Sequence, residues 1–437
     1  MVIKNLLVLS LFVAFHFAAV AQSAKGLKST IDGQISEIEP STIEWRHYLH
    51  EYPELSNREY KTSGFVAEKL REFGLEVTTG IAHTGVVGIL RGGKPGPVIA
   101  LRADMDGLPV KERVPLEWAS QAVGEYNGEE VPVMHACGHD VHMSILLGTA
   151  QVLSDIRDQL AGTVKFIFQP AEEGAPDGEE GGAALMVNEG VLKNPEAEVI
   201  FGLHIKAEFE VGEIHYKPEG FMAAVNSFKV KVKGKQTHGS QPWSGVDPIV
   251  TSALIINGLQ TVVSRRAELT QAPAVVSVGA IQGGLRSNII PEEVEMIGTI
   301  RTLDYDMRKK ILEDIETTIL RIAESQGASA EISIDKGYPI TYNDPALLED
   351  MLPTLRESAG IENVHLTKPW TGAEDFAFYQ QEIPGLFFFL GGTPKGKLDQ
   401  AFPHHTPDFF VADESMRTGI RTFCYLVVDY LGKDKSR

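Results

Sequence analysis

The chain has 437 residues, of which 43% are hydrophobic and 23% charged, and its formal net charge is −19. A chain of this length predicts two domains rather than one. The acidic balance, 59 Asp and Glu against 40 Lys and Arg, excludes the protein classes that bind nucleic acid or anionic membranes through a basic surface.

The first 21 residues have the features of a signal peptide. Lys4 provides the positive charge, residues 6–20 form a short apolar stretch, and Ala19-Val20-Ala21 is an A-x-A cleavage site. The apolar stretch is short for a membrane span, and no membrane span is expected. The sequence therefore predicts a secreted or periplasmic protein whose mature chain begins near Gln22.

The segment 22–219 predicts alternating helices and strands. Ser41-x-x-Glu44 is a capping box that predicts a helix start, and a second helix is expected from residue 59 to 73, before Gly74. Apolar runs at 86–91, 98–102, 163–168 and 198–203 predict buried strands. A helix is expected over 141–156, with Asp140 as its N-cap.

Several of these strands run directly into polar residues that can bind a metal. Strand 98–102 leads to Asp104 and Asp106, strand 163–168 to Glu172 and Glu173, and strand 198–203 to His204. A later strand, 385–390, precedes His404 and His405. Because ligands bind at the carboxyl edge of an open α/β sheet, we expect these side chains to converge there.

The segment 220–338 has a different pattern. Its expected elements follow the order β-α-β-β-α-β, which is typical of a ferredoxin-like fold. We therefore expect a second domain inserted into the first, whose sheet resumes in the segment 339–437.

The peptide MHACGHDVH, residues 134–142, has the strongest metal-binding character. Thiolate and imidazole at Cys137 and His139 favour zinc, whereas nearby carboxylates move the preference toward manganese. Cys424 is the only other cysteine, and both are expected to be unpaired, because a disulfide would consume the thiol of this motif. Together with Glu172, Glu173 and His204, the candidates outnumber the ligands of one tetrahedral ion and suggest two ions that share a ligand.

Two other interpretations of these residues remain. Glu172 and Glu173 also fit a solvated acidic loop with Asp177, Glu179 and Glu180. Cys137 could instead be a nucleophile activated by His139, although a separation of two residues suits a metal chelate better.

Six motifs in this order resemble the amidohydrolase branch of the M20 metallopeptidases, which includes hippurate hydrolases, N-acyl-amino-acid amidohydrolases and plant auxin-conjugate hydrolases: RADMDGLP, HACGHDVH, FQPAEEG, GLHI, GAEDF and HHTPDF. The resemblance covers essentially the whole mature chain. It implies a mixed-sheet α/β catalytic domain that binds two metal ions, and an inserted α+β domain that acts as a lid and dimerises.

The resemblance also implies roles for individual residues. The metal ligands would be Cys137, His139, Glu173, His204 and His405, and Glu172 would be the base. His405 is preferred to His404 because the family pattern His-x-Pro matches His405-Thr406-Pro407. Asp104 and Asp106 would support the ligands without binding metal.

Residues outside the ligand set are implied as well. His238 would complete the site of a neighbouring subunit and stabilise the oxyanion, unless it is a plain surface histidine. Asn288 and Arg301 resemble the family's substrate-holding pair, although Arg301 could instead form a surface salt bridge. Glu374 and Asp375 would either fix the metal site or cap a helix.

We therefore expect a metal-dependent amidohydrolase that cleaves N-acyl or N-aroyl amino acids and forms a homodimer or tetramer through residues 220–338. A carboxypeptidase or dipeptidase of the same family is the first alternative. A cysteine-nucleophile hydrolase and a catalytically silent binding protein are the others.

Overall fold

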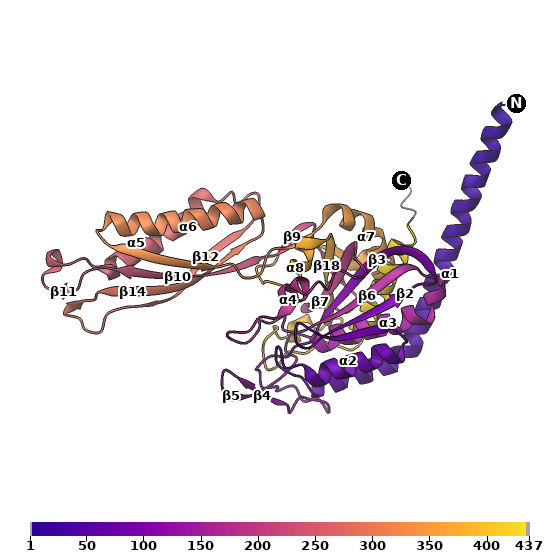
Figure 1. Ribbon diagram of the computed structural model, residues 1–437, viewed down its shortest axis with the longest axis horizontal. Coiled ribbons are helices and arrows are strands. Elements are labelled where there is room, and N and C mark those ends of the chain that lie inside the picture. The colour runs from indigo at the N-terminus through magenta and orange to yellow at the C-terminus, as the bar shows by residue number, and fades with distance from the viewer. Residues whose placement is uncertain (1, 434–437) are drawn as a thin grey trace. The chain divides into compact units, whose positions relative to one another are not determined.

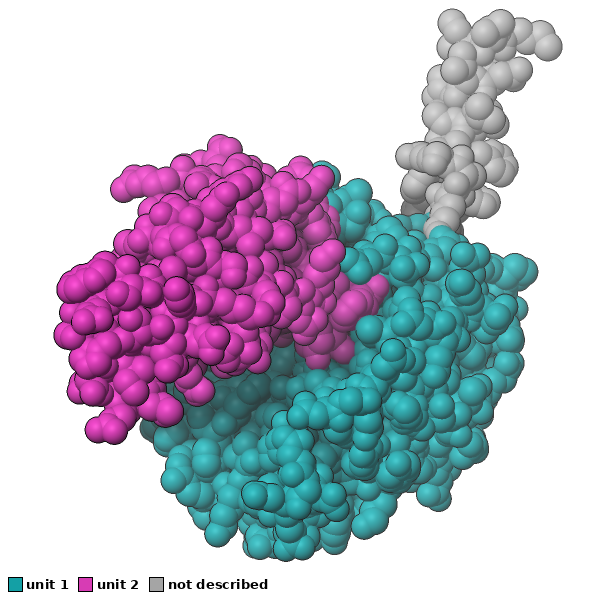
Figure 2. Space-filling model, turned by 60° about the vertical axis from the view of Figure 1, so that its left-hand side comes forward, with its two compact units in different colours: residues 1–216, 343–367, 379–437 teal, residues 217–342, 368–378 magenta. Residues whose placement is uncertain are grey.

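The computed structural model describes residues 2–433, and of these the side chains of residues 26–433. The chain divides into two compact units, which Figure 2 distinguishes by colour: unit 1 contains residues 1–216, 343–367 and 379–437, and unit 2 contains residues 217–342 and 368–378. The segment 368–378, which the sequence analysis placed in the first domain, belongs to unit 2. The signal peptide predicted at residues 1–21 lies outside the described side chains and stays a prediction.

Unit 1 contains a mixed sheet of eight strands (Figure 1) in the order β1-β2-β6-β3-β7-β18-β8-β17. The pairs β6–β3, β3–β7, β7–β18 and β8–β17 are parallel, whereas the pairs β1–β2, β2–β6 and β18–β8 are antiparallel. The mixed α/β fold was predicted correctly. The strand bounds are β1 Glu76–Ile81, β2 Gly85–Arg91, β3 Lys94–Asp104, β6 Ala161–Gln169, β7 Val199–Glu210, β8 Ile214–Tyr216, β17 Val364–Leu366 and β18 Gly385–Thr393.

Helices pack against this sheet. The helix α3 follows the Cys137 motif and is buried along nearly its whole length, its polar residues included. The helices of this unit are α1 Val2–Glu51, α2 Tyr60–Glu72, α3 His139–Asp155, α4 Gly182–Asn188, α7 Pro345–Ala359 and α9 Ser415–Leu431, and α8 Ala377–Glu382 crosses the boundary between the units.

The predicted helix start at Ser41 is wrong, because α1 continues through Pro40. Ile31 and Ile35 are buried one turn apart and belong to the main core. Arg421 of α9 also donates to Asp32 at 2.7 Å. Tertiary packing along this face therefore overrides the capping signal.

Two further boundaries differ from the prediction. Asp140 is the second residue of α3 rather than its N-cap, and its carboxylate accepts hydrogen bonds from Arg46 and His50. Strand β7 does not end before His204 but continues to Glu210. His204 therefore lies within the strand, opposite Phe389 of β18. No helix among the described residues is long and apolar enough to span a membrane.

Unit 2 has a four-stranded antiparallel sheet in the order β12-β14-β10-β15, with α5 and α6 along one face (Figure 1). This strand order and the β-α-β-β-α-β sequence of elements match the ferredoxin-like pattern. The elements are β10 Ala224–Lys233, α5 Pro248–Thr261, β12 Ala274–Gln282, β14 Glu293–Thr302, α6 Tyr305–Ser325 and β15 Ser329–Asp335. Short two-stranded pairs are β11 Thr237–His238 with β13 Ile289–Ile290, and β9 Glu219–Met222 with β16 Thr341–Asn343.

Candidate metal centre

Cys137 lies where two groups of potential metal ligands meet. The first group is Cys137, His139 and His204, and the second is Cys137, Glu173 and His405; within each group the ligand atoms lie within 4.8 Å of one another. The Cys137 sulfur is 3.3 Å from His204 Nε2, and His405 Nε2 is 3.1 Å from Glu173 Oε1. The structure thus brings together all five predicted ligands, in an arrangement that fits two ions sharing the sulfur.

His139 is held so that one ring nitrogen faces this group. Its Nδ1 lies 2.9 Å from the backbone oxygen of Asp106, which leaves Nε2 facing the carboxylates of Asp104 at 3.7 Å and Glu172 at 3.8 Å. This Nε2 is buried and has no hydrogen-bond partner among the described residues. Because an orphaned buried nitrogen is costly, the arrangement fits an atom that binds a divalent ion.

Asp106 and Asp104 form hydrogen bonds and an ion pair with residues next to the ligand groups. The Asp106 carboxylate accepts hydrogen bonds from Ser56 Oγ at 2.8 Å and from the backbone N–H of Glu173 at 3.0 Å. Asp104 forms a buried ion pair with Arg102 and lies 2.6 Å from His142 Nδ1. Both carboxylates therefore connect the end of β3 to the neighbouring segments of the site.

The loop that carries Glu172 and Glu173 is fixed by a residue that the sequence analysis overlooked. Glu59, the N-cap residue of α2, accepts a hydrogen bond from the backbone N–H of Ala171 at 2.9 Å. Ala171 has φ 51°, a left-handed conformation that is strained for a residue other than glycine. Burial, together with the Asp106 charge, raises the pKa of Glu59 to about 8.

His404, which the sequence analysis considered and set aside in favour of His405, also lies close to Cys137. Its Nδ1 lies 3.7 Å from the Cys137 sulfur, and its side chain is buried, whereas His405 is 53% exposed. The backbone N–H of Ala207 also approaches His404 Nε2 at 3.3 Å. The adjacent histidines thus both reach the Cys137 region, and His405 forms a group with Cys137 and Glu173.

The electrostatics of the site disfavour a free thiolate. Burial raises the pKa of Cys137 well above its usual value, and the carboxylates of Glu173 and Glu172 raise it further. Burial and the Lys206 charge hold the pKa of His204 well below its usual value, so this imidazole is neutral and can bind a cation. Burial opposes the charged form of His139, but the Asp104 charge and the Asp106 hydrogen bond outweigh it and raise the pKa to about 10. These carboxylates therefore favour a positive charge at the ring, which a metal ion bound to Nε2 would supply in place of the proton. Cys137 and Cys424 are both unpaired, as predicted.

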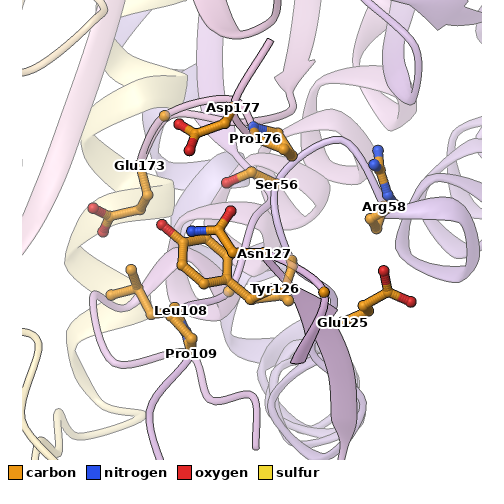
Figure 3. Close-up of a pocket in the computed structure, with 14 residues that line it drawn as sticks. Ser56, Arg58, Leu108, Pro109, Glu125, Tyr126, Asn127, Glu173, Pro176 and Asp177 are labelled. Carbon is orange, nitrogen blue, oxygen red and sulfur yellow. The ribbon is translucent and has the colours of Figure 1, made fainter. Parts of the chain in front are cut away.

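A cavity of about 640 Å³ opens beside Glu173 (Figure 3). Ser56 lines one side, and Leu108 and Pro109 line another. Tyr126 and Asn127 reach it from the hairpin formed by β4 Val123–Tyr126 and β5 Glu129–Pro132. The hairpin turn is Asn127-Gly128, and both residues have positive φ, as a two-residue type I′ turn requires.

The remaining predicted residues lie in unit 2. His238 and Asn288 belong to one small substructure, since β11 pairs with β13 and the backbone N–H of Gly239 donates to Asn288 O. The backbone N–H of Ser240 donates to His238 Nδ1 at 3.0 Å. His238 therefore carries its proton on Nε2, where the imidazole can act as a donor.

Arg301 is half-buried and forms no ion pair with any acidic residue that the structure describes. Its Nη1 donates instead to Thr299 Oγ1 at 2.5 Å. Glu374 and Asp375 are buried in the turn before α8. Glu374 Oε1 accepts a hydrogen bond from the backbone N–H of Phe376 there.

Residues 100–429 match the profile of peptidase family M20/M25/M40. The chain belongs to this family. Thermostable carboxypeptidase 1 of Saccharolobus solfataricus is 39% identical to this M20 protein over 409 residues, which are 93% of this chain and 100% of the relative. N-acetyl-L-cysteine deacetylase of Bacillus subtilis is 37% identical over 376 residues, 86% of this chain and 85% of the relative.

Among solved structures, a dinuclear metal-binding peptidase of the M20 family from Bacillus subtilis superimposes with a TM-score of 0.76. It is 34% identical, and the alignment covers 91% of this chain and 99% of the other. This M20 protein is therefore a metal-dependent hydrolase of amide bonds. The two ligand groups around Cys137 support a pair of divalent ions.

Proposed function

We propose that this M20 enzyme hydrolyses N-acyl or N-aroyl amino acids. The observation that carries the proposal is the pair of ligand groups that share Cys137, with Glu172 placed beside His139 at 3.8 Å. Two relatives carry names that describe hydrolysis of this class of amide: N-acetyl-L-cysteine deacetylase and N-acyl-L-amino acid amidohydrolase.

Cys137, His139, Glu173, His204 and His405 would hold the two ions in this proposal. When bound, two divalent ions supply Lewis-acid polarisation of the carbonyl and lower the pKa of water. Sulfur and imidazole in the ligand set favour zinc, and the carboxylates also allow manganese. Metal analysis of the purified protein distinguishes the two.

Glu172 is the proposed general base. It accepts a proton from the attacking water and then delivers it to the nitrogen of the leaving amine. Its carboxylate is buried, and Glu172 and Glu173 occupy the two central positions of a turn that the Gly174 N–H closes on Ala171 O, so the two side chains can serve different roles. Asp106 orients His139 and the Glu173 backbone, and Glu59 holds Ala171 in its strained conformation.

The cavity beside Glu173 is the proposed site for the acyl group. Leu108, Pro109 and the ring of Tyr126 provide apolar surface that suits an alkyl or aromatic acyl chain. Arg58, which also lines the cavity, is paired with Glu179 and is therefore not free to bind an anion. Arg301, which has no acidic partner among the described residues, is the proposed ligand of the substrate carboxylate, and Asn288 assists it.

Unit 2 is the proposed dimerisation element, and His238 is the proposed oxyanion donor to the site of the partner. The outer face of α5 is apolar and exposed at Ile249, Val250 and Leu254. Gly284, beside the fully exposed Leu285, lies close to Ile249, so this apolar surface continues toward the β11–β13 pair. Export through residues 1–21 is also proposed, and N-terminal sequencing of the mature protein tests it.

Hydrolysis of a substrate panel by wild-type protein and by Glu172→Gln tests the function. We expect turnover of hippurate or an acetyl-amino acid that exceeds turnover of dipeptides, and a loss of about 10³-fold or more in kcat for the variant. The metal content and melting temperature of the variant should be unchanged. Preference for dipeptides would favour the carboxypeptidase or dipeptidase alternative, and activity of Glu172→Gln within a few-fold of wild type would remove Glu172 from its role.

A further inference from the structure

A second cluster of potential metal ligands lies at the β8–β17 edge of the unit-1 sheet. Glu213 precedes β8, His215 lies in β8, and His365 lies in the edge strand β17. The strands β8 and β17 are parallel, and His365 is directly opposite His215 in their register. Side chains at opposed positions share one face of a sheet, so the two imidazoles lie side by side.

The distances within the cluster suit a metal ion. Glu213 Oε2 lies 3.0 Å from His215 Nε2, and Glu213 Oε1 lies 3.8 Å from His365 Nε2. All three ligand atoms lie within 4.8 Å of one another. Ligand atoms around a tetrahedral zinc ion, with bonds of about 2.0–2.1 Å, are separated by about 3.3–3.5 Å, a value between the two observed distances.

A simple hydrogen bond explains only part of this arrangement. Glu213 and His215 form an ordinary pair at 3.0 Å, but His365 faces the other oxygen of the same carboxylate at a distance beyond hydrogen bonding. Two imidazole rings with centroids 4.9 Å apart thus converge on one carboxylate. A divalent ion accounts for all three orientations.

The surroundings make the cluster rigid and keep it separate from the metal centre. The Phe209 ring stacks on His215 with centroids 3.6 Å apart, which fixes the imidazole plane. Phe389 is paired with His204 on one side and with His215 on the other, so an apolar residue stands between the two sites in the sheet. The Lys206 ammonium lies over the Phe389 ring at 4.9 Å and adds a positive charge between them.

We propose that Glu213, His215 and His365 bind one further divalent ion of the zinc class, apart from the two ions of the metal centre. Two nitrogen ligands and one carboxylate select zinc, nickel or cobalt over magnesium or calcium, which prefer oxygen. The side chains are 26%, 13% and 40% exposed, so the ion is reachable from solvent and keeps positions for water. Bound metal would join the edge strand β17 to β8.

Zinc stoichiometry tests the proposal on the full chain. Wild-type protein, His365→Ala and Glu213→Gln are dialysed against low-micromolar zinc, and zinc per chain is measured by mass spectrometry. We expect both variants to bind one zinc fewer than wild type and to keep the wild-type rate of amide hydrolysis. Zinc should also raise the melting temperature of wild type more than that of His365→Ala.

His83→Asn is the matched control, because His83 is another exposed histidine of unit 1 and Asn tolerates its positive φ of 77°. It should bind as much zinc as wild type. Equal zinc content in wild type and in both cluster variants would overturn the proposal. The result does not depend on which amide the enzyme hydrolyses.

Discussion

The sulfur of Cys137 lies 3.3 Å from His204 Nε2, and the same sulfur belongs to the group completed by Glu173 and His405. A buried thiol whose pKa is raised by burial and by neighbouring carboxylates is a poor nucleophile in the absence of a cation. A divalent ion reverses this effect, because it stabilises the thiolate that binds it. The geometry and the charges around Cys137 therefore both favour a shared metal ligand over a catalytic nucleophile.

Arg301 provides a test of substrate recognition. Arg301→Met should raise KM for an N-acyl amino acid by about 10–100-fold with kcat changed only a few-fold, because a charge-assisted hydrogen bond contributes about 1.5–3 kcal/mol. The matched control is the same substrate with its carboxylate converted to an amide, for which wild type and variant should have similar KM. An equal loss on both substrates would show that Arg301 acts on the fold rather than on the carboxylate.

Glu59 makes stability depend on pH. The folded protein holds the Glu59 proton up to about pH 8, whereas the unfolded chain releases it near the ordinary value of 4.5. The folded state therefore binds more protons in this interval, and this group lowers the stability as pH rises through it, by about 1.4 kcal/mol per unit of pKa difference.

Glu59→Gln removes this effect while keeping an acceptor for the Ala171 N–H. Its melting temperature, measured from about pH 5 to about pH 8 by calorimetry, should rise progressively relative to wild type. Glu68→Gln, which changes an exposed carboxylate of the same helix, should follow wild type at every pH. A pH-independent difference between Glu59→Gln and wild type would contradict the assignment of the buried proton.

A charged substitution on the apolar face of α5 tests the proposed dimer. Leu254→Glu should convert the dimer to monomers in light scattering, because a charge on an apolar interface must be desolvated. Leu320→Glu is the control on α6, since Leu320 is 39% exposed and Leu254 41%. If the Leu254→Glu protein remains dimeric, or if the wild type is monomeric, the apolar face of α5 does not form the proposed dimer interface.

The sequence predicted the parts of this site that depend on local pattern. Apolar strands followed by Glu172 or Asp104 are visible in a single pass along the chain, and parallel strands then bring these residues to one edge. His204 departs from this rule, because β7 continues beyond it and pairs with β18. The length of a strand depends on its partner, which a local pattern does not contain.

Other features escaped prediction because they arise only from tertiary contacts. Glu59 is more than a hundred positions from Ala171, yet it fixes the backbone before Glu172. Ser41 and Glu44 form a capping-box sequence, but the packing of α1 keeps the helix continuous through this position. The segment 368–378 joins unit 2 because its backbone bonds to strand β9, as in the hydrogen bond from Trp370 N to Phe221 O.

Anomalous diffraction from crystals grown with zinc or manganese tests most directly the central claim that Cys137 is shared by two metal ions. The account predicts two strong peaks in the metal centre, both within about 2.3–2.5 Å of the Cys137 sulfur, one also bound to His139 and His204 and the other to Glu173 and His405. A single peak there, or a pair of ions that Cys137 does not contact, would contradict the shared thiolate on which the proposed chemistry depends.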